Sequence, residues 1–241
     1  MEPAARPRPA GGVDRALVLT GVIGMAAFTG LIAASAWIYD AVAEADGVSG
    51  LDRPALDWSI SARTPLRETW VTAFTNLGQA LPMVLLGLVL SSLIWWRWRR
   101  RTIWVLILVA SVGSVAFTIV GKALIGRRRP PLADAVPPYE LSFSFPSGHA
   151  LNSTVVAGML AYLVVWLSRR LWVRLAAVAA AVLWATAMGL SRVFLGHHWL
   201  TDVVFAWLIG LAWLALLITV HQAALRVRSP RPARISQSPA D

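Results

Sequence analysis

Cysteine is absent from this 241-residue sequence, and both lysine and charged residues in general are scarce. Without cysteine the chain can form neither disulfides nor thiolate metal sites, so both kinds of centre are excluded. Charged residues make up 14% of the chain, against about 25% in an average soluble protein. Lys122 is the single lysine among 22 basic residues, and 57% of all residues are hydrophobic. This composition is typical of an integral membrane protein.

Six apolar runs each approach the length of about 20 residues that a helix needs to cross a bilayer. No alternating strand pattern occurs, and backbone groups in lipid must bond internally, so we expect helices. The runs lie at residues 16–39, 70–96, 102–122, 148–168, 171–191 and 201–221. The expected fold class is therefore all-α, a six-transmembrane-helix bundle formed by residues 16–221. Residues 1–15 and 222–241, rich in Pro, Arg and Ala, are expected to be cytoplasmic disordered tails.

Two features flank the first run. Ala41-Val42-Ala43 has the small residues of a signal-peptidase site. The run before it, at 16–39, is longer than the roughly 7–15 residues of a signal-peptide core, so we expect it to be retained. In the following loop, Pro54 to Arg63 opens with proline and places Leu56 four residues before Ile60. This spacing predicts a short helix lying at the membrane surface.

Basic residues are distributed unequally between the two sets of loops and ends. One set, which includes both termini, has 14 basic and three acidic residues, whereas the other has eight basic and nine acidic residues. By the positive-inside rule, both termini are expected to be cytoplasmic and the loops near 40–69, 123–147 and 192–200 external. The net charge of +10 gathers at the ends of apolar runs and forms no basic stripe with interleaved aromatics, so nucleic acid is not an expected partner.

Pro146-Ser147-Gly148-His149 stands at the start of the fourth run, on the external side. We expect Ser144 to cap this helix, with Pro146 in its first turn. Ser147, Gly148 and His149 would then follow where backbone N–H groups are unpaired, which favours phosphate binding. An ordinary capped helix with an interfacial histidine is the alternative.

Ser191-Arg192 and the pair His198 and Asp202 form a second external group. Residues four apart share a helical face, so the Asp202 carboxylate can orient His198 and leave its other ring nitrogen free as a nucleophile. His197 is off that face and is interpreted as a bystander. Arg192 offers a guanidinium fork to phosphate oxygens. A salt bridge among Arg192, His198 and Asp202 is the alternative.

Lys122 and the run Arg127-Arg128-Arg129 place four cations in one external segment, against the positive-inside trend. A bound anion accounts for them, and lipid-headgroup binding is the alternative. A cluster rich in cations repels divalent metals, and His149 lacks a partner at metal-ligand spacing. We therefore expect no metal and no cofactor.

The three segments, written K-x6-R-P, P-S-G-H and S-R-x5-H-x3-D, together resemble the signature of the type 2 phosphatidic acid phosphatase family, which is related to the haloperoxidases. The resemblance implies phosphate binding by Lys122, Arg129, Ser147, Gly148 and Arg192. It also implies nucleophilic attack by His198, orientation by Asp202 and proton transfer by His149. Vanadate is then expected to mimic the transition state without any metal.

The resemblance further implies a bacterial plasma-membrane enzyme that hydrolyses a lipid phosphate or diphosphate, most similar to the undecaprenyl pyrophosphate and phosphatidylglycerol phosphate phosphatases. The expected partners are this substrate and membrane lipid, with no obligate protein partner. A phosphotransferase with the same site and a non-catalytic lipid-binding or transport protein remain alternatives. Asn76, Gln79 and Asn152 are candidate cavity residues, but the sequence does not identify the lipid.

Overall fold

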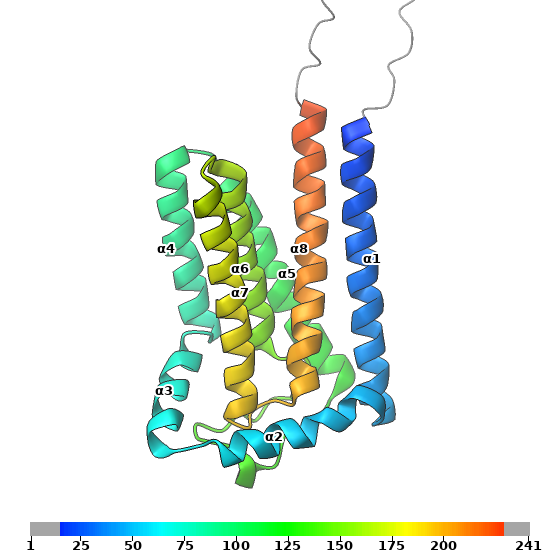
Figure 1. The fold of residues 1–241 in the computed structure, drawn as a ribbon, viewed down its shortest axis with the longest axis vertical. Coiled ribbons are helices and arrows are strands. Elements are labelled where there is room, and N and C mark those ends of the chain that lie inside the picture. The colour runs from blue at the N-terminus through cyan, green and yellow to red at the C-terminus, as the bar shows by residue number, and fades with distance from the viewer. Residues whose placement is uncertain (1–14, 229–241) are drawn as a thin grey trace, which may run out of the picture.

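The computed structural model describes residues 15–228, and this part of the chain is helical without any strand (Figure 1). The elements are α1 (Arg15–Glu44), a 3₁₀ turn (Gly47–Leu51), α2 (Asp52–Ser61), α3 (Pro65–Asn76), α4 (Ala80–Trp98), α5 (Thr102–Ile125), a 3₁₀ turn (Leu132–Asp134), α6 (Gly148–Leu167), α7 (Leu171–Phe194) and α8 (Leu200–Arg228). Within the described residues, six helices are long and apolar enough to cross a membrane: α1, α4, α5, α6, α7 and α8. The expected all-α, six-span fold class is confirmed.

The second predicted span, at 70–96, is wrong in its extent. Residues 65–76 form the separate helix α3, and the spanning helix α4 follows after a break at Leu77–Gln79. Thr64 caps α3 by accepting a hydrogen bond from the Arg67 backbone N–H, and Pro65 opens its first turn. Gly78 lies in the break against Met188, where a Cβ would collide with that side chain. A continuous apolar pattern concealed this break because α3 also carries apolar residues.

Helix α6 is the centre of the bundle. Of its most hydrophobic window, 61% is buried, whereas none of the corresponding window of α1 is. Leu151, Met159 and Leu163 of α6 are completely buried in the hydrophobic core. Helices α4, α5, α7 and α8 all pack against α6, and α1 packs mainly along α8. Figure 1 shows α1 and α8 side by side at one edge of the molecule. The first turn of α6 is therefore held by most of the bundle.

The ends of the helices place the functional segments together. The start of α1 and the end of α8 lie at one end of the bundle, and α2 lies across the opposite end (Figure 1). Helix α2 confirms the expected short helix near 54–63. Helix α8 continues to Arg228, so residues 222–228 belong to the bundle and not to a tail. Arg15, the last residue of the other expected tail, begins α1, and residues 1–14 and 229–241 lie outside the described residues. The end marked by α2 carries the candidate site.

Candidate phosphate-binding and catalytic site

His198 and Asp202 form the buried pair that their spacing predicts. The His198 Nδ1 atom lies 3.3 Å from Asp202 Oδ2, and the two side chains are 1% and 0% exposed. Gly196 makes the turn before them with φ +71°, where a Cβ would collide with the backbone of Asp134. The Trp199 backbone N–H also donates to Asp202 Oδ2, at 3.0 Å. Asp202 therefore holds the ring and accepts from Nδ1–H, which leaves Nε2 unprotonated.

Three residues outside the predicted catalytic and phosphate-binding set hold Asp202 in place. Arg127 bonds Asp202 Oδ1 at 2.5 Å with one nitrogen and Asp52 Oδ2 at 2.7 Å with the other. Asp52, at the start of α2, accepts in addition from the backbone and the hydroxyl of Thr201. The Ser144 hydroxyl donates a short hydrogen bond to Asp202 Oδ2. Asp202 is thus paired with Arg127, and α2 is tied to the site.

Arg129 connects the nucleophile candidate to the other cations. Its Nη1 atom lies 3.1 Å from His198 Nε2 and also donates to the His197 carbonyl. Its Nη2 atom donates to Glu140 Oε2 at 2.8 Å, and its Nε atom donates to the Ser142 carbonyl at 2.7 Å. The Arg129 guanidinium therefore stands directly beside the ring nitrogen that Asp202 leaves free.

Arg192 lies on the opposite side of the Glu140 carboxylate. Its side chain is 2% exposed, and it forms a short ion pair with Glu140 Oε1. It also donates to Thr75 Oγ1 at 3.3 Å, and Thr75 accepts from Ser191 at 2.9 Å. Arg192 Nε has no partner in the described chain. The alternative of a salt bridge among Arg192, His198 and Asp202 is wrong for Arg192, because Arg192 pairs with Glu140, whereas Asp202 contacts His198 and Arg127.

Lys122 approaches the same cluster from the last turn of α5. Its Nζ atom donates to Ser142 Oγ at 2.8 Å, and the same hydroxyl lies 3.1 Å from Arg129 Nη2. Glu140, Arg192 and Arg129 are among the charged groups that act on Lys122. The lysine is therefore the third cation of the cluster.

The start of α6 differs from the prediction in its capping residue. The helix begins at Gly148 with Ser147 as the N-cap residue, and Pro146 precedes it. The expectation that Ser144 caps this helix is wrong, because the Ser144 hydroxyl bonds Asp202 instead. Ser147 is fully buried, and its hydroxyl makes no hydrogen bond in the described chain. The free N–H groups of the first turn and this hydroxyl are thus available to an anion.

His149 faces the same charged group. Its Nε2 atom is buried and has no hydrogen-bond partner within the described residues, and Arg192, Glu140 and His197 are its charged or titratable neighbours. His197 instead bonds the Val136 carbonyl at 2.7 Å through Nε2 and, within the described residues, makes no hydrogen bond to Asp202. This geometry fits the assignment of His197 as a bystander and leaves a ring nitrogen of His149 free to exchange a proton.

Electrostatics favour neutral His197 and His198 side chains beside a charged carboxylate. Burial, together with Arg129 and Arg192, holds the pKa of His198 well below its usual range. Burial lowers the pKa of His197 to about 4. For Glu140 burial acts in the opposite direction, but Arg192 and Arg129 more than offset it and lower the pKa to about 2. At neutral pH, His198 is therefore an uncharged base, and Glu140 is an anion.

All eight residues singled out in the sequence gather at this end of the bundle, and Glu140, Ser142, Ser144, Arg127, Asp52 and Thr75 join them. The sequence places Arg127 among the external cations and predicts Ser144 as a helix cap, but it predicts this role for neither, and no motif marks the other four; Glu140 and Asp134 are the two acidic residues between the arginine run and Pro146. Within residues 15–228 no group of three or more His, Asp or Glu side chains is arranged to hold a metal ion. The site is thus a ring of cations and N–H groups around a neutral histidine, which suits phosphoryl transfer.

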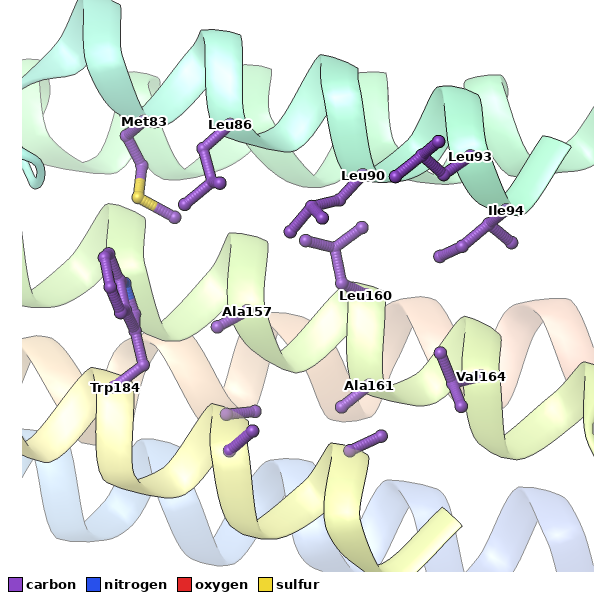
Figure 2. A pocket seen from close by; sticks show the side chains of 13 residues that line it. Met83, Leu86, Leu90, Leu93, Ile94, Ala157, Leu160, Ala161, Val164 and Trp184 are labelled. Atoms are coloured by element: carbon purple, nitrogen blue, oxygen red, sulfur yellow. The ribbon is translucent and has the colours of Figure 1, made fainter. Parts of the chain in front are cut away.

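Two apolar cavities lie at different distances from this cluster. One of about 590 Å³ lies between α2, α3 and α7, with Trp58, Trp70 and Phe74 in its lining, and reaches Ser191 beside Arg192. The other, of about 440 Å³, lies between α4, α6 and α7, and Figure 2 shows that only hydrocarbon side chains, a thioether and an indole line it.

Of the candidate cavity residues, Gln79 bonds Asn76 at 3.1 Å, and Asn152 has a buried oxygen without a partner in the described part.

Comparison with known proteins agrees with the geometry. The PAP2 superfamily model matches residues 103–226. Phosphatidylglycerophosphatase B of Bacillus subtilis is 30% identical over 178 residues, which cover 72% of this chain and 85% of that protein. An undecaprenyl-diphosphatase of Sulfolobus acidocaldarius is 32% identical over 124 residues, 49% of this chain and 55% of that protein.

Solved structures give the same answer for the fold. The transmembrane PAP2-type phosphatidylglycerolphosphate phosphatase of Bacillus subtilis superposes with a TM-score of 0.71 and 25% identity, over 86% of this chain and 98% of that one. LpxE of Aquifex aeolicus superposes with a TM-score of 0.52, which concerns the fold alone at 24% identity. Because the family model matches more than half of the chain, and because the first relative is matched over most of its length, this membrane-spanning protein belongs to the PAP2 superfamily and is a phosphatase.

Proposed function

We propose that the protein hydrolyses a lipid phosphate or diphosphate at the extracytoplasmic face of a bacterial plasma membrane, through a phosphohistidine on His198. The observation that carries this proposal is the buried His198, with Nδ1 on Asp202 and Nε2 3.1 Å from Arg129. A neutral imidazole beside several cations is suited to attack a phosphorus atom whose oxygens those cations hold.

The first half of the reaction forms a covalent intermediate. Lys122, Arg129, Arg192 and the N–H groups at the start of α6 bind the phosphate oxygens. The Nε2 lone pair of His198 attacks phosphorus, the bond from phosphorus to the lipid oxygen breaks, and His149, which is an imidazolium once the phosphate anion is bound beside it, gives that oxygen a proton. The Asp202 carboxylate stabilises the positive ring by accepting from Nδ1–H.

The second half releases inorganic phosphate. His149, now neutral, takes a proton from a water molecule, and the water oxygen attacks phosphorus. The phosphorus–nitrogen bond breaks and returns the electron pair to His198. The protein residues thus end in their starting state, and no metal takes part in these steps.

A lipid substrate is supported by the surroundings of the site. The cavity of about 590 Å³ beside Ser191 is lined mostly by apolar side chains, among them Trp58 and Trp70. It can therefore hold the hydrocarbon chain of a lipid next to Arg192. The relatives named above are a phosphatidylglycerophosphatase and an undecaprenyl-diphosphatase. We therefore assign a phosphomonoester of a glycerolipid or a prenyl diphosphate as the substrate class.

The extracytoplasmic face is assigned from charge. The loops and chain ends assigned to the opposite side carry most of the arginines, including Arg97, Arg99, Arg100 and Arg101 between α4 and α5. Since cytoplasmic loops of membrane proteins carry the excess of basic residues, the site lies on the outer side and both termini lie in the cytoplasm.

Rapid-quench labelling tests the mechanism. Substrate with ³²P in the transferred phosphate should give acid-labile, base-stable label on the wild-type protein in EDTA. The His198→Ala variant should give none, whereas His197→Ala is the matched control, because it removes the neighbouring ring and should label normally. Label on His198→Ala with loss of label on His197→Ala would assign the nucleophile to the other histidine.

A further inference from the structure

The carboxylate of Glu140 lies between the two arginines that the proposed function assigns to phosphate. Oε2 is 2.8 Å from Arg129 Nη2, and Oε1 forms a short ion pair with Arg192 Nη2. Each carboxylate oxygen thus pairs with a different guanidinium. Two oxygens of a phosphate group would make the same pair of contacts. Glu140 therefore takes up N–H groups that the substrate needs.

The two arginines need an anion when no substrate is bound. Arg192 is 2% exposed and Arg129 is 11% exposed, and an unpaired guanidinium at such burial is strongly unfavourable. Burial lowers the pKa of Arg129, which reflects this penalty. In the empty site Glu140 supplies the missing charge. Other side chains near the two arginines, such as Thr75 and Ser142, are neutral hydrogen-bond partners.

Glu140 approaches from the solvent side on a segment with few anchors. Its side chain is 31% exposed, much more than either arginine. The segment is fixed by the Val136 backbone N–H, which donates to the Leu195 carbonyl at 2.9 Å, and by the Ser144 N–H, which donates to the Arg127 carbonyl at 2.8 Å. Between these two points, residues 137–143 make no backbone–backbone hydrogen bond within the described chain; Ser142 is held by side chains, since Arg129 donates to its carbonyl and Lys122 to its hydroxyl. The carboxylate can therefore swing away without disturbing a helix.

We propose that Glu140 is a built-in competitor of the substrate phosphate, paired with Arg129 and Arg192 in the empty site and displaced when a phosphate group enters. This inference rests on the proposed function, because it takes the two arginines as phosphate ligands. A phosphomonoester dianion or a diphosphate carries more charge than a carboxylate and displaces it. An anion therefore occupies the site only when it binds the two arginines more strongly than the Glu140 carboxylate does.

A competitor of this kind has a quantitative signature. An anion that binds only the open site has an apparent dissociation constant equal to its intrinsic value divided by the open fraction. Removal of the competitor should therefore lower the apparent dissociation constant of every anion by the same factor. If Glu140 simply repelled bound anions, its removal would lower their dissociation constants by factors that grow with the charge of each anion. If Glu140 instead organised the arginines, its removal would weaken the binding of every anion.

The test uses the full-length protein in detergent micelles with Glu140→Gln, which keeps the side-chain shape and removes the charge. The inhibition constants of orthovanadate and of inorganic phosphate are measured against a water-soluble phosphomonoester. Both should fall by the same factor, at least about tenfold for the loss of a bidentate charge-assisted pair. Asp134→Asn is the matched control: it removes a negative charge from the same external loop, where the carboxylate pairs with Arg53, and both constants should stay unchanged.

Several outcomes would overturn the inference. Unchanged or raised inhibition constants in Glu140→Gln would make Glu140 an organiser of the arginines, and unequal factors for the two anions would indicate simple repulsion. An equal decrease in Asp134→Asn would assign the effect to the general field of the loop. Glu140→Ala serves as a second variant if the glutamine form is unstable. The proposed function fails separately, when folded wild-type protein neither releases phosphate nor incorporates label at His198.

Discussion

Replacement of Arg127 by Gln tests whether the ion pairs behind Asp202 support both the fold and the reaction. Arg127 bridges Asp52 and Asp202, whose side chains are 6% and 0% exposed. In Arg127→Gln two buried carboxylates lose their cation, while the hydrogen bonds from Ser144, Thr201 and the Trp199 backbone remain. We expect lower stability together with lower activity.

The size of the effect follows from burial. Removal of one partner from a buried ion pair costs about 3–5 kcal/mol, because it leaves an uncompensated charge. Arg127 itself is 18% exposed, and water can approach the vacated space, so the lower end applies and we expect about 3 kcal/mol. Asp52→Asn in the same background removes one of the two stranded charges. The double variant should therefore regain about 1 kcal/mol or more over Arg127→Gln, as a favourable coupling between the two positions.

Tryptophan fluorescence during thermal unfolding in detergent measures the stability, and phosphate release by the same samples measures activity. Arg128→Gln is the matched control, since Arg128 is the exposed neighbour in the same run, and its midpoint should equal that of the wild type. Equal midpoints for Arg127→Gln and Arg128→Gln would refute the reasoning. So would a double variant less stable than the sum of its two single changes.

Three further predictions follow from the site and its setting. A reporter fused after residue 228 should behave as cytoplasmic and one inserted near Ala135 as external; the reverse pattern would contradict the extracytoplasmic site. Arg192→Lys keeps the charge but loses the fork that reaches both Glu140 and Thr75, so phosphate release should fall by about tenfold or more with normal membrane insertion, and a near-wild-type rate would exclude bidentate binding. His149→Ala should lose about 10²–10⁴-fold on an alkyl phosphomonoester but much less on p-nitrophenyl phosphate, whose leaving group needs no proton; equal losses on both would remove His149 as the general acid.

The sequence predicted the parts of the site that are local in the chain. The spacing of His198 and Asp202 places both on one helical face, and this pair lies within hydrogen-bonding distance in the structure. The spanning helices were predictable for the same reason, since about 20 apolar residues in a row have few other structures in a membrane. Helix ends were less predictable: α8 and α1 continue beyond the apolar runs because their last turns carry charged residues outside the hydrocarbon.

The remaining parts depend on contacts between distant segments. Arg127 and Arg128 look alike in the sequence, yet one bridges Asp52 and Asp202 and the other is exposed. Asp52 lies 75 residues before Arg127, and no local pattern links them. Ser144 has the sequence features of a helix cap, but Asp202 binds its hydroxyl more directly. Such choices are decided by the tertiary packing of loops, which spacing does not encode.

Helix α2 connects the catalytic centre to the membrane surface. It lies across the ends of the spanning helices that carry the site (Figure 1), and its Trp58 is 70% exposed. Tryptophan at the surface of a membrane prefers the level of the headgroups, so the lipid fixes the height of α2. Asp52 of α2 pairs with Arg127, and Arg127 pairs with Asp202, so these ion pairs fix the position of Asp202 relative to α2. The height of the His198 ring is thus set relative to the membrane surface on which α2 lies, and a bilayer of different thickness should leave its distance from that surface unchanged.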